Sequence, residues 1–141
     1  MHLRPFRESD RASVIALWRA AGLLRPWNDP ERDIDRKVAL NDELFVVGED
    51  AAGVLVAVVM IGYDGHRGWV YYLAVDPDCQ GQGLGRVLMQ AAEHRLLALG
   101  CPKLNLQVRV GNESVLAFYR ALGYEVDAAV GLGKRLIVDG D

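Results

Sequence analysis

The chain has 141 residues, of which 51% are hydrophobic and 25% are charged, and its formal net charge is −3. This composition is typical of a soluble globular protein, and the slight acidic excess argues against a general nucleic-acid binder, which normally carries a basic excess. No apolar stretch approaches the ~20 residues of a membrane span. From these two observations we expect neither a nucleic acid nor a membrane as a partner.

The length predicts a single domain, residues 1–141, that can bury roughly two-thirds of its extended surface. The segment "MHLRPFRESD" is charged from its fourth residue, unlike a signal peptide, so we expect a cytoplasmic protein. The two cysteines, Cys79 and Cys101, form no C-x-x-C pair and show no metal-ligand spacing with the three histidines. We therefore expect reduced thiols and no metal site.

The first forty residues predict one strand and two helices. "HLRPF" (2–6) predicts a short strand, and "ESDRASVIALWRAAG" (8–22) has apolar residues at helical spacing. The loop "LLRPWNDP" (23–30) leads to a second helix over residues 30–40. Since this second helix has few strong apolar positions, we expect it to lie on the surface.

Three strands follow the second helix. "ELFVVGE" (43–49) and "GVLVAVVMIGYD" (53–64) are rich in β-branched residues, and the short "DAAG" between them predicts a hairpin. "GWVYYLAVDP" (68–77) predicts a third strand, paired with the second through "GHRG".

The second half predicts two more helices and three more strands. A long helix that ends at Gly100 has a predicted apolar face made of Leu84, Val87, Leu88, Ala91, Arg95 and Leu99. "KLNLQVRV" (103–110) predicts a strand, "NESVLAFYRALG" (112–123) a short helix, and "YEV" (124–126) and "GLGKRLIVD" (131–139) the last two strands. This order predicts the α/β fold class, with a mixed sheet that is antiparallel in its first half and has one βαβ crossover.

A glycine-rich stretch, "DCQGQGLGRVL" (78–88), separates the third strand from the long helix. The first N–H groups of a helix have no intrahelical acceptor, and the helix dipole adds positive charge there. Glycines let an anion approach the backbone closely, so the stretch predicts a phosphate site, with a tight turn without ligand as the alternative. A dinucleotide fingerprint would need glycine where Arg86 stands, and the P-loop sequence is absent.

Two longer segments carry a family resemblance. "YYLAVDPDCQGQGLGRVLMQAAE" (71–93), followed by "GNESVLAFYRALGYE" (111–125), resembles the acetyl-CoA-binding core of the GNAT superfamily of N-acetyltransferases. The glycines fit the pattern Q-x-x-G-x-G, joined to an L-A-V-x-P strand end and an N-x₆-Y helix. The element order is similar along the whole chain, and the glycine spacing together with "LLRPWNDP" and "GYDGHRG" resembles the small bacterial YpeA-like members.

The resemblance implies the GNAT acyl-CoA N-acyltransferase fold, with a central, mostly antiparallel, splayed sheet flanked by helices. It also implies an N-acetyltransferase that moves the acetyl group of acetyl-CoA, its cosubstrate, to a primary amine. The amine would attack the thioester directly through a tetrahedral intermediate, with no metal and no enzyme nucleophile. A non-catalytic acyl-CoA-binding sensor, or an interaction module on the same fold, is the alternative.

The resemblance assigns roles to individual residues. The implied acetyl-CoA contacts are Leu73, Ala74, Val75, Gly81, Gln82, Gly83, Leu84, Gly85, Arg86 and Asn112. Tyr119 would be the catalytic general acid that protonates the departing CoA thiolate, with a core tyrosine as the alternative. A phenol of pKa ~10 can do this, although transfer to the thiolate of a thiol of pKa ~8.5 is slightly uphill in solution.

The general base is not evident from the sequence. In ribosomal-protein N-terminal-alanine acetyltransferases a glutamate serves as base, and the matching position here is Gln107, whose amide cannot accept a proton. The replacements on offer are Asp64 and His66, which also suit a turn, and one of Tyr71 and Tyr72. Since successive strand residues point to opposite faces, we expect only one of the two tyrosines to face the acceptor.

The acceptor is a small-molecule or protein amine that the sequence does not identify. Trp27, in the loop between the first two helices, is either a wall of the acceptor site or a plug in the core. The acidic residues of the second helix (Glu31, Asp33 and Asp35) could attract a cationic amine or could form a solvated face. The final strand could also pair with a second copy to form a homodimer.

Overall fold

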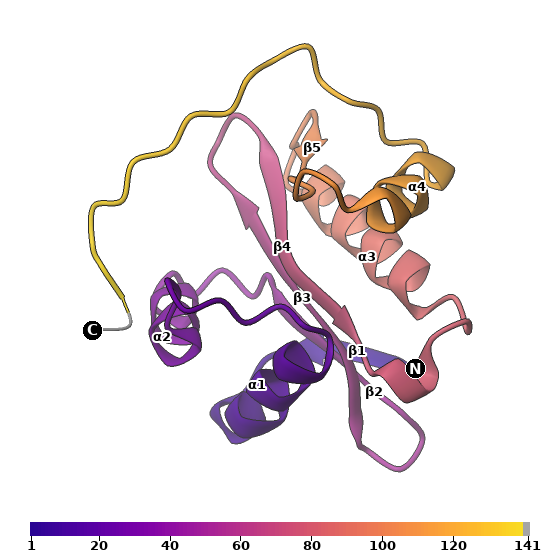
Figure 1. The fold of residues 1–141 in the computed structure, drawn as a ribbon. Helices are drawn as coiled ribbons and strands as arrows, with labels where there is room; N and C mark the ends of the chain where they lie inside the picture. Colours follow the sequence, from indigo (N-terminus) through magenta and orange to yellow (C-terminus); the bar gives the residue numbers. More distant parts are fainter. Residues whose placement is uncertain (140–141) are drawn as a thin grey trace.

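The computed structural model describes residues 1–139. In chain order its elements are β1 (His2–Pro5), α1 (Arg11–Ala20), α2 (Pro30–Ala39), β2 (Phe45–Glu49), β3 (Leu55–Tyr63), β4 (Gly68–Val75), α3 (Leu84–Ala98), β5 (Leu104–Asn105) and α4 (Glu113–Ala121). Short 3₁₀ turns, η1 (Glu8–Asp10) and η2 (Pro77–Cys79), precede α1 and α3. Figure 1 shows α1 and α2 on one face of the central sheet and α3 and α4 on the other.

The sheet has five strands in the order β1-β2-β3-β4-β5. The first four pair antiparallel and β5 pairs parallel to β4, which confirms the expected mixed, mostly antiparallel sheet flanked by helices. The β4–β5 pairing covers only Gly68 with Leu104 and Trp69 with Asn105. Within the described chain, β4 then continues to Val75 with no strand on that edge, so the two strands splay apart.

A hydrophobic core lies on each face of the sheet, because successive strand residues point to opposite sides. On the α1–α2 face, Trp18 and Val58 belong to one buried cluster. On the α3–α4 face, Leu88 and Val59 belong to a second one. The sheet is therefore covered on both sides, and its strands read as nearly continuous apolar runs.

A bulge interrupts β4 beside the splayed region. The register slips in β3 between Val58 and Met60, so that two residues of β4, Tyr72 and Leu73, oppose a single residue of β3. Tyr72 has a φ of 53°, a left-handed conformation that is uncommon for a residue other than glycine. A bulge bends its strand and re-aims the side chains, and this one lies shortly beyond the point where β5 leaves β4.

The buried face of α3 differs in part from the expected one. Its buried residues are Leu88, Met89, Ala92 and Leu96. Leu88 was expected, but Val87 and Leu99 are 38% and 54% exposed. The reason is that α3 packs against α4 as well as the sheet, since a Cβ on Gly85 would lie 3.1 Å from Cζ of Phe118. Because glycine has no apolar side chain, the spacing of apolar residues does not reveal that Gly85 lies on the packed face of α3.

The expectation that α2 lies on the surface is only partly right. Val38 and Leu40 are exposed, but Ile34 is fully buried in the core beneath α1 and α2. Lys37, three residues after Ile34, is buried as well. Residues three apart lie on the same face of a helix, so Lys37 lies on the buried face together with Ile34.

The last two expected strands, 124–126 and 131–139, are not formed in the described chain, and the strand expected over 103–110 is reduced to Leu104–Asn105. After α4 the chain runs in extended form along the outside of the molecule and returns to α2 (Figure 1). An alternating apolar pattern becomes a strand only where a neighbouring strand satisfies its backbone groups. No strand pairs with this segment among residues 1–139.

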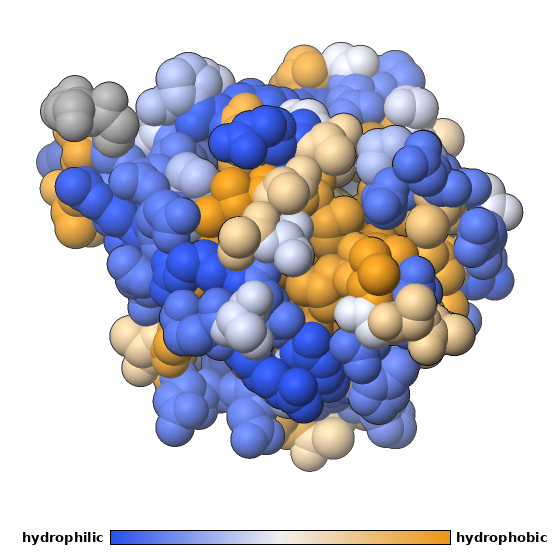
Figure 2. All heavy atoms as spheres, turned by 90° about the horizontal axis from the view of Figure 1, so that it is seen from below, coloured by the Kyte–Doolittle hydropathy of each residue, from blue (hydrophilic) through white to orange (hydrophobic). Residues whose placement is uncertain are grey.

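Figure 2 shows the face seen from below in Figure 1, where charged and polar residues surround a smaller group of hydrophobic ones. Among residues 1–139, no helix combines the length and apolar character needed to cross a membrane.

Replacing Asp10 with alanine is expected to lower the free energy of unfolding by about 3 kcal/mol. Asp10 is 6% exposed, and its carboxylate accepts hydrogen bonds from Nη1 and Nη2 of Arg4 at 2.8 and 2.9 Å. Its removal leaves the largely buried guanidinium of Arg4 without this partner. Urea unfolding measures the loss, with the exposed Glu8→Ala as the matched control.

The same pair predicts the pH dependence of stability. Hydrogen bonds from Arg4 hold the pKa of Asp10 below its ordinary value. Because the folded state has the lower pKa, the stabilisation is complete above the ordinary carboxyl value of about 3.9 and is lost as the pH falls through the depressed value. Equal losses in Asp10→Ala and Glu8→Ala would contradict the role given to Asp10.

Candidate active site

The turn between β4 and α3 adopts the conformation for which its glycines are suited. Gly81 and Gly83 have φ values of 83° and 75°, in the left-handed region that side chains rarely adopt. A Cβ added at either residue would meet no atom within 4 Å. These two glycines are therefore required by backbone conformation, and the space beside them is open to a ligand.

The N-terminus of α3 has no side-chain cap. Gly83 is the N-cap residue, and Val87 makes the first helical bond, donating its N–H to the carbonyl of Gly83 at 3.1 Å. The amides of Leu84, Gly85 and Arg86 consequently have no intrahelical acceptor. A helix of fifteen residues ends here with its positive dipole end toward the open space, which is a suitable setting for a phosphate group.

Gly85 has a second role that the sequence did not reveal. It lies in the first turn of α3 and faces Phe118 of α4 at the close distance described above. Its missing Cβ lets α4 approach α3. The glycine spacing of the motif therefore serves both the backbone at the turn and the packing of the two helices.

The edge of β4 beside this turn offers unpaired backbone groups. The amide of Asp76 donates to the carbonyl of Val56 in β3 at 2.8 Å. Because backbone groups alternate along a strand, the N–H and C=O of Val75 point to the opposite edge, which β5 has left. Where β5 separates from β4, the side-chain oxygen of Asn105 is buried without a hydrogen-bond partner in the described chain. An extended ligand that carries amide groups could satisfy these positions.

Asn112 and Tyr119 lie on α4, as expected. Asn112 is the N-cap, and its side-chain oxygen accepts a hydrogen bond from the amide of Val115 at 3.4 Å. Tyr119 is buried, and its ring makes edge contacts with Phe118 and Tyr124 at centroid distances of 5.0 and 5.8 Å. Burial raises the pKa of Tyr119, so its hydroxyl keeps its proton to a higher pH than an exposed phenol does.

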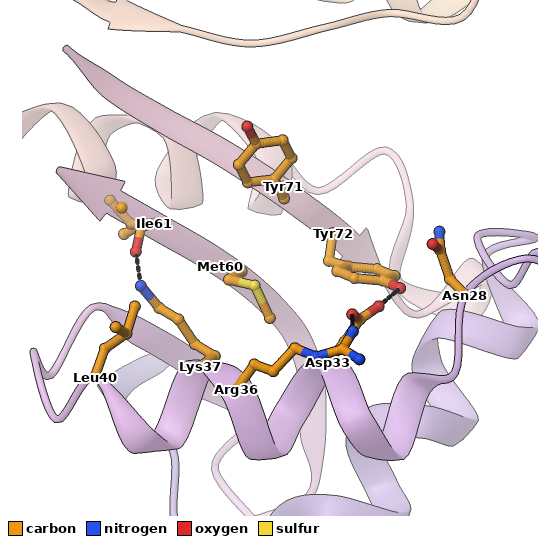
Figure 3. A pocket seen from close by; sticks show the side chains of 10 residues that line it. Asn28, Asp33, Arg36, Lys37, Leu40, Met60, Ile61, Tyr71 and Tyr72 are labelled. Atoms are coloured by element: carbon orange, nitrogen blue, oxygen red, sulfur yellow. Dashed lines mark hydrogen bonds and ion pairs between the residues drawn. The ribbon is translucent and has the colours of Figure 1, made fainter. Parts of the chain in front are cut away.

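A pocket of about 500 Å³ lies on the other face of the sheet, between α2 and the strands β3 and β4 (Figure 3). It is lined by Asn28, Asp33, Arg36, Lys37, Leu40, Met60, Ile61, Gly62, Tyr71 and Tyr72. The expectation that only one of the two tyrosines could face this side was wrong. The bulge at Tyr72 breaks the strand alternation, so both tyrosines line the pocket.

Tyr72 is the most firmly held residue of the pocket. Its hydroxyl donates a hydrogen bond to Oδ2 of Asp33 at 2.6 Å, as Figure 3 shows. Its ring stacks on Trp18 at a centroid distance of 3.9 Å. Burial, and then the carboxylate of Asp33, raise the pKa of Tyr72. Tyr71, in contrast, extends away from α2 and is partly exposed.

A buried lysine forms another side of the pocket. The ammonium of Lys37 donates to Oδ2 of Asp42 at 2.9 Å and to the carbonyl of Ile61. The sequence interpretation missed this residue because lysine on a polar helix is normally solvated. Its spacing of three from Ile34 was the signal that could have placed it on the inner face.

The other candidates for the acceptor side lie outside this pocket. Asp64 accepts hydrogen bonds from the amides of Arg67 and His66 at 2.7 and 2.8 Å, which lower the pKa of its carboxyl. It thus serves the β3–β4 turn, and the exposed His66 belongs to the same turn. Trp27 is exposed, which rules out a core plug, and the guanidinium of Arg109 lies 5.1 Å from the centre of its ring.

The chain is similar to known acetyltransferases. A sequence model of the acetyltransferase (GNAT) family matches residues 12–124. An acetyltransferase of Yersinia enterocolitica is 52% identical over 139 residues, which cover 99% of this chain and 98% of that protein.

Solved structures with a similar fold include Ard1 from Thermoplasma volcanium, with a TM-score of 0.79 and 23% identity over 90% of this chain and 84% of that one. The ribosomal-protein-S18-alanine N-acetyltransferase from Escherichia coli gives a TM-score of 0.72 and 24% identity over 86% and 76% of the two chains. At these identities the likeness shows the fold.

The contact between Gly85 and Phe118 predicts an energetic coupling. Alanine is favoured over glycine in a helix by about 1 kcal/mol. In the parent chain we expect Gly85→Ala to give little of this gain, because the new Cβ crowds the phenyl ring. In a Phe118→Ala background the same change should stabilise the protein by close to the full ~1 kcal/mol. Urea unfolding of the four proteins measures the coupling, and equal effects of Gly85→Ala in both backgrounds would show that the contact has no energetic weight.

Proposed function

Because the chain belongs to the acetyltransferase (GNAT) family, we propose that it transfers the acetyl group of acetyl-CoA to a primary amine. The observation that carries this proposal is the uncapped N-terminus of α3, with Gly81 and Gly83 opening the space in front of it. A pyrophosphate needs several convergent N–H donors and no side chains in the way, and this turn provides both.

The chain would hold the donor through backbone groups. The amides from Gly81 to Arg86 would bind the pyrophosphate. The segment Leu73, Ala74 and Val75 would lie along the extended pantetheine arm, with the backbone groups of Val75 on the free edge as its hydrogen-bond partners. The buried oxygen of Asn105 lies at the fork where that arm would pass, and it supports this path since it still needs a donor. Asn112, the N-cap of α4, would also contact this arm.

The amine would enter from the opposite face, through the pocket between α2 and β4. Direct attack needs an uncharged amine, and Asp33 is the carboxylate that lines this pocket. We propose that Asp33, with the hydroxyl of Tyr72 bonded to it, orients the amine and accepts its proton. Asp64 is less suited because it holds its turn, and Gln107 cannot accept a proton.

The remaining groups fit direct transfer rather than an acyl-enzyme. Backbone N–H groups on the free edge of β4 would stabilise the oxyanion of the tetrahedral intermediate. The thiolate of CoA would leave and take the proton of Tyr119. Cys79, near the turn, is an unsuitable nucleophile because burial, and then Asp76 and Asp78, raise the pKa of its thiol.

Acetyl-CoA is expected to raise the Tm of the parent chain, by the equivalent of about 2.7 kcal/mol at a hundredfold excess over Kd. Gly83→Ala should lose most of this stabilisation, since its side chain disturbs the turn before α3. Gly53→Ala is the matched control, because Gly53 also has a positive φ and open space around it but lies in the β2–β3 turn. Equal ligand stabilisation in the two variants would exclude the N-terminus of α3 as the donor site.

Tyr119→Phe is expected to slow turnover by roughly tenfold or more while the Tm shift with acetyl-CoA persists. The change removes only the hydroxyl, so the packing of the ring remains. CoA release with an accepted amine measures turnover. A rate equal to that of the parent chain would remove Tyr119 as the general acid.

A non-catalytic acyl-CoA sensor is the second candidate. Two observations favour it. Gln107 stands where ribosomal-protein N-terminal-alanine acetyltransferases have the glutamate that acts as general base, and Asp64 is hydrogen-bonded within its own turn. A full Tm shift with acetyl-CoA, without CoA release for any amine in a panel of amino acids, peptides and small amines, would favour the sensor.

A further inference from the structure

The carboxylate of Asp139 occupies an anion-binding site formed by arginines of α2. Asp139 accepts hydrogen bonds from Nη2 and Nη1 of Arg36 at 2.8 and 2.9 Å, one to each oxygen. Nη1 of Arg32 and the amide of Asp29 each donate to it at 3.4 Å. A fork of this kind from a single guanidinium is the strong and geometrically specific way to bind a carboxylate.

The segment that delivers Asp139 makes two other polar contacts: Lys103 pairs with Asp127, and Nη1 of Arg135 donates to the carbonyl of Trp27 at 3.3 Å. The side chain of Asp139 is only 5% exposed, whereas Leu132 and Leu136, in the same segment, are 96% and 89% exposed. The segment forms no strand pairs in the described chain and follows the outside of the molecule (Figure 1). The polar contacts to the carboxylate itself come from Arg36 and Arg32 of α2 and from the amide of Asp29.

The anion site adjoins the pocket described above. Arg36 lines the pocket together with Asp33 and Tyr72, and its Nη1 also lies 3.3 Å from Oδ1 of Asp33 (Figure 3). Hydrogen bonds from Arg36 keep the pKa of Asp139 well below its ordinary value, so Asp139 stays charged near neutral pH. If Asp139 leaves, the two arginines lose an anion that another carboxylate in the pocket can replace.

We propose that Arg36, assisted by Arg32, binds the carboxylate of the acceptor, and that Asp139 occupies this site as a competitor in the free protein. The proposal rests on the proposed acetyl transfer and names its substrate class as amino acids with an apolar side chain. The amine of such a molecule would lie toward Asp33 and Tyr72 while the carboxylate lies on Arg36. The apolar side chain would face Leu40 and Met60, which are apolar residues of the lining.

The first test measures binding without turnover, with N-acetyl-L-leucine as the probe and N-acetyl-L-leucinamide as its uncharged counterpart. Calorimetry should show that Asp139→Asn binds N-acetyl-L-leucine about tenfold more tightly than the parent chain, because the competing carboxylate is gone. Asp127→Asn is the matched control, since Asp127 lies in the same segment but pairs with Lys103. Arg36→Gln in the Asp139→Asn background should abolish binding.

The second test measures transfer, with L-leucine and L-leucinamide as acceptors. Arg36→Gln should raise the ratio of KM for L-leucine to KM for L-leucinamide by about tenfold, because only L-leucine carries the carboxylate that Arg36 binds. The two acceptors differ in amine pKa, but this difference is the same for both proteins. It therefore cancels when the ratio of the two KM values in the variant is compared with that ratio in the parent chain. If no amine releases CoA, the proposed acetyl transfer fails, and the calorimetry still decides whether the carboxylate site exists.

The proposal is overturned if Asp139→Asn binds N-acetyl-L-leucine no better than Asp127→Asn does. It is also overturned if the acid and the amide bind alike, or if Arg36→Gln changes KM for both acceptors equally. A lower Tm of Asp139→Asn without any gain in affinity would make Asp139 a structural anchor of the C-terminal segment.

Discussion

The bulge at Tyr72 is the constraint on which the two halves of the site depend. A left-handed conformation in a residue other than glycine costs about 1–3 kcal/mol and persists only where the surroundings fix it. Here the stack on Trp18 and the hydrogen bond to Asp33 hold the side chain in place. The bulge lets both Tyr71 and Tyr72 line the pocket, and it bends β4 in the region that β5 has left.

The surroundings of β4 therefore differ on its two sides. On one side lie backbone amides at the start of α3 and the free edge near Val75, which suit a long, anionic donor with amide groups. On the other lies a pocket whose walls combine apolar side chains with Asp33, Arg36 and Lys37. The proposed direct transfer uses neither cysteine, and neither Cys79 nor Cys101 lines the pocket.

Local sequence patterns were sufficient to predict the elements up to α4, although β5 is much shorter than expected, and the conformation of the turn at Gly81 and Gly83. The splayed sheet was expected from the family resemblance. They could not place the bulge, because its position depends on the register between β3 and β4 and not on the residues of β4 alone. Lys37 was missed because its burial depends on a carboxylate and a carbonyl supplied by residues 42 and 61. The C-terminal strands were expected from alternation, but the described chain offers them no partner strand.

In the proposed function, the amides before and within the first turn of α3 bind the donor. An amide ¹H–¹⁵N spectrum recorded during a titration with acetyl-CoA tests it most directly, since it reports each N–H separately. We expect the largest shifts at Gly81, Gly83, Gly85 and Arg86, accompanied by Val75 on the edge of β4. Saturable shifts confined to other parts of the chain, or none at all, would contradict it.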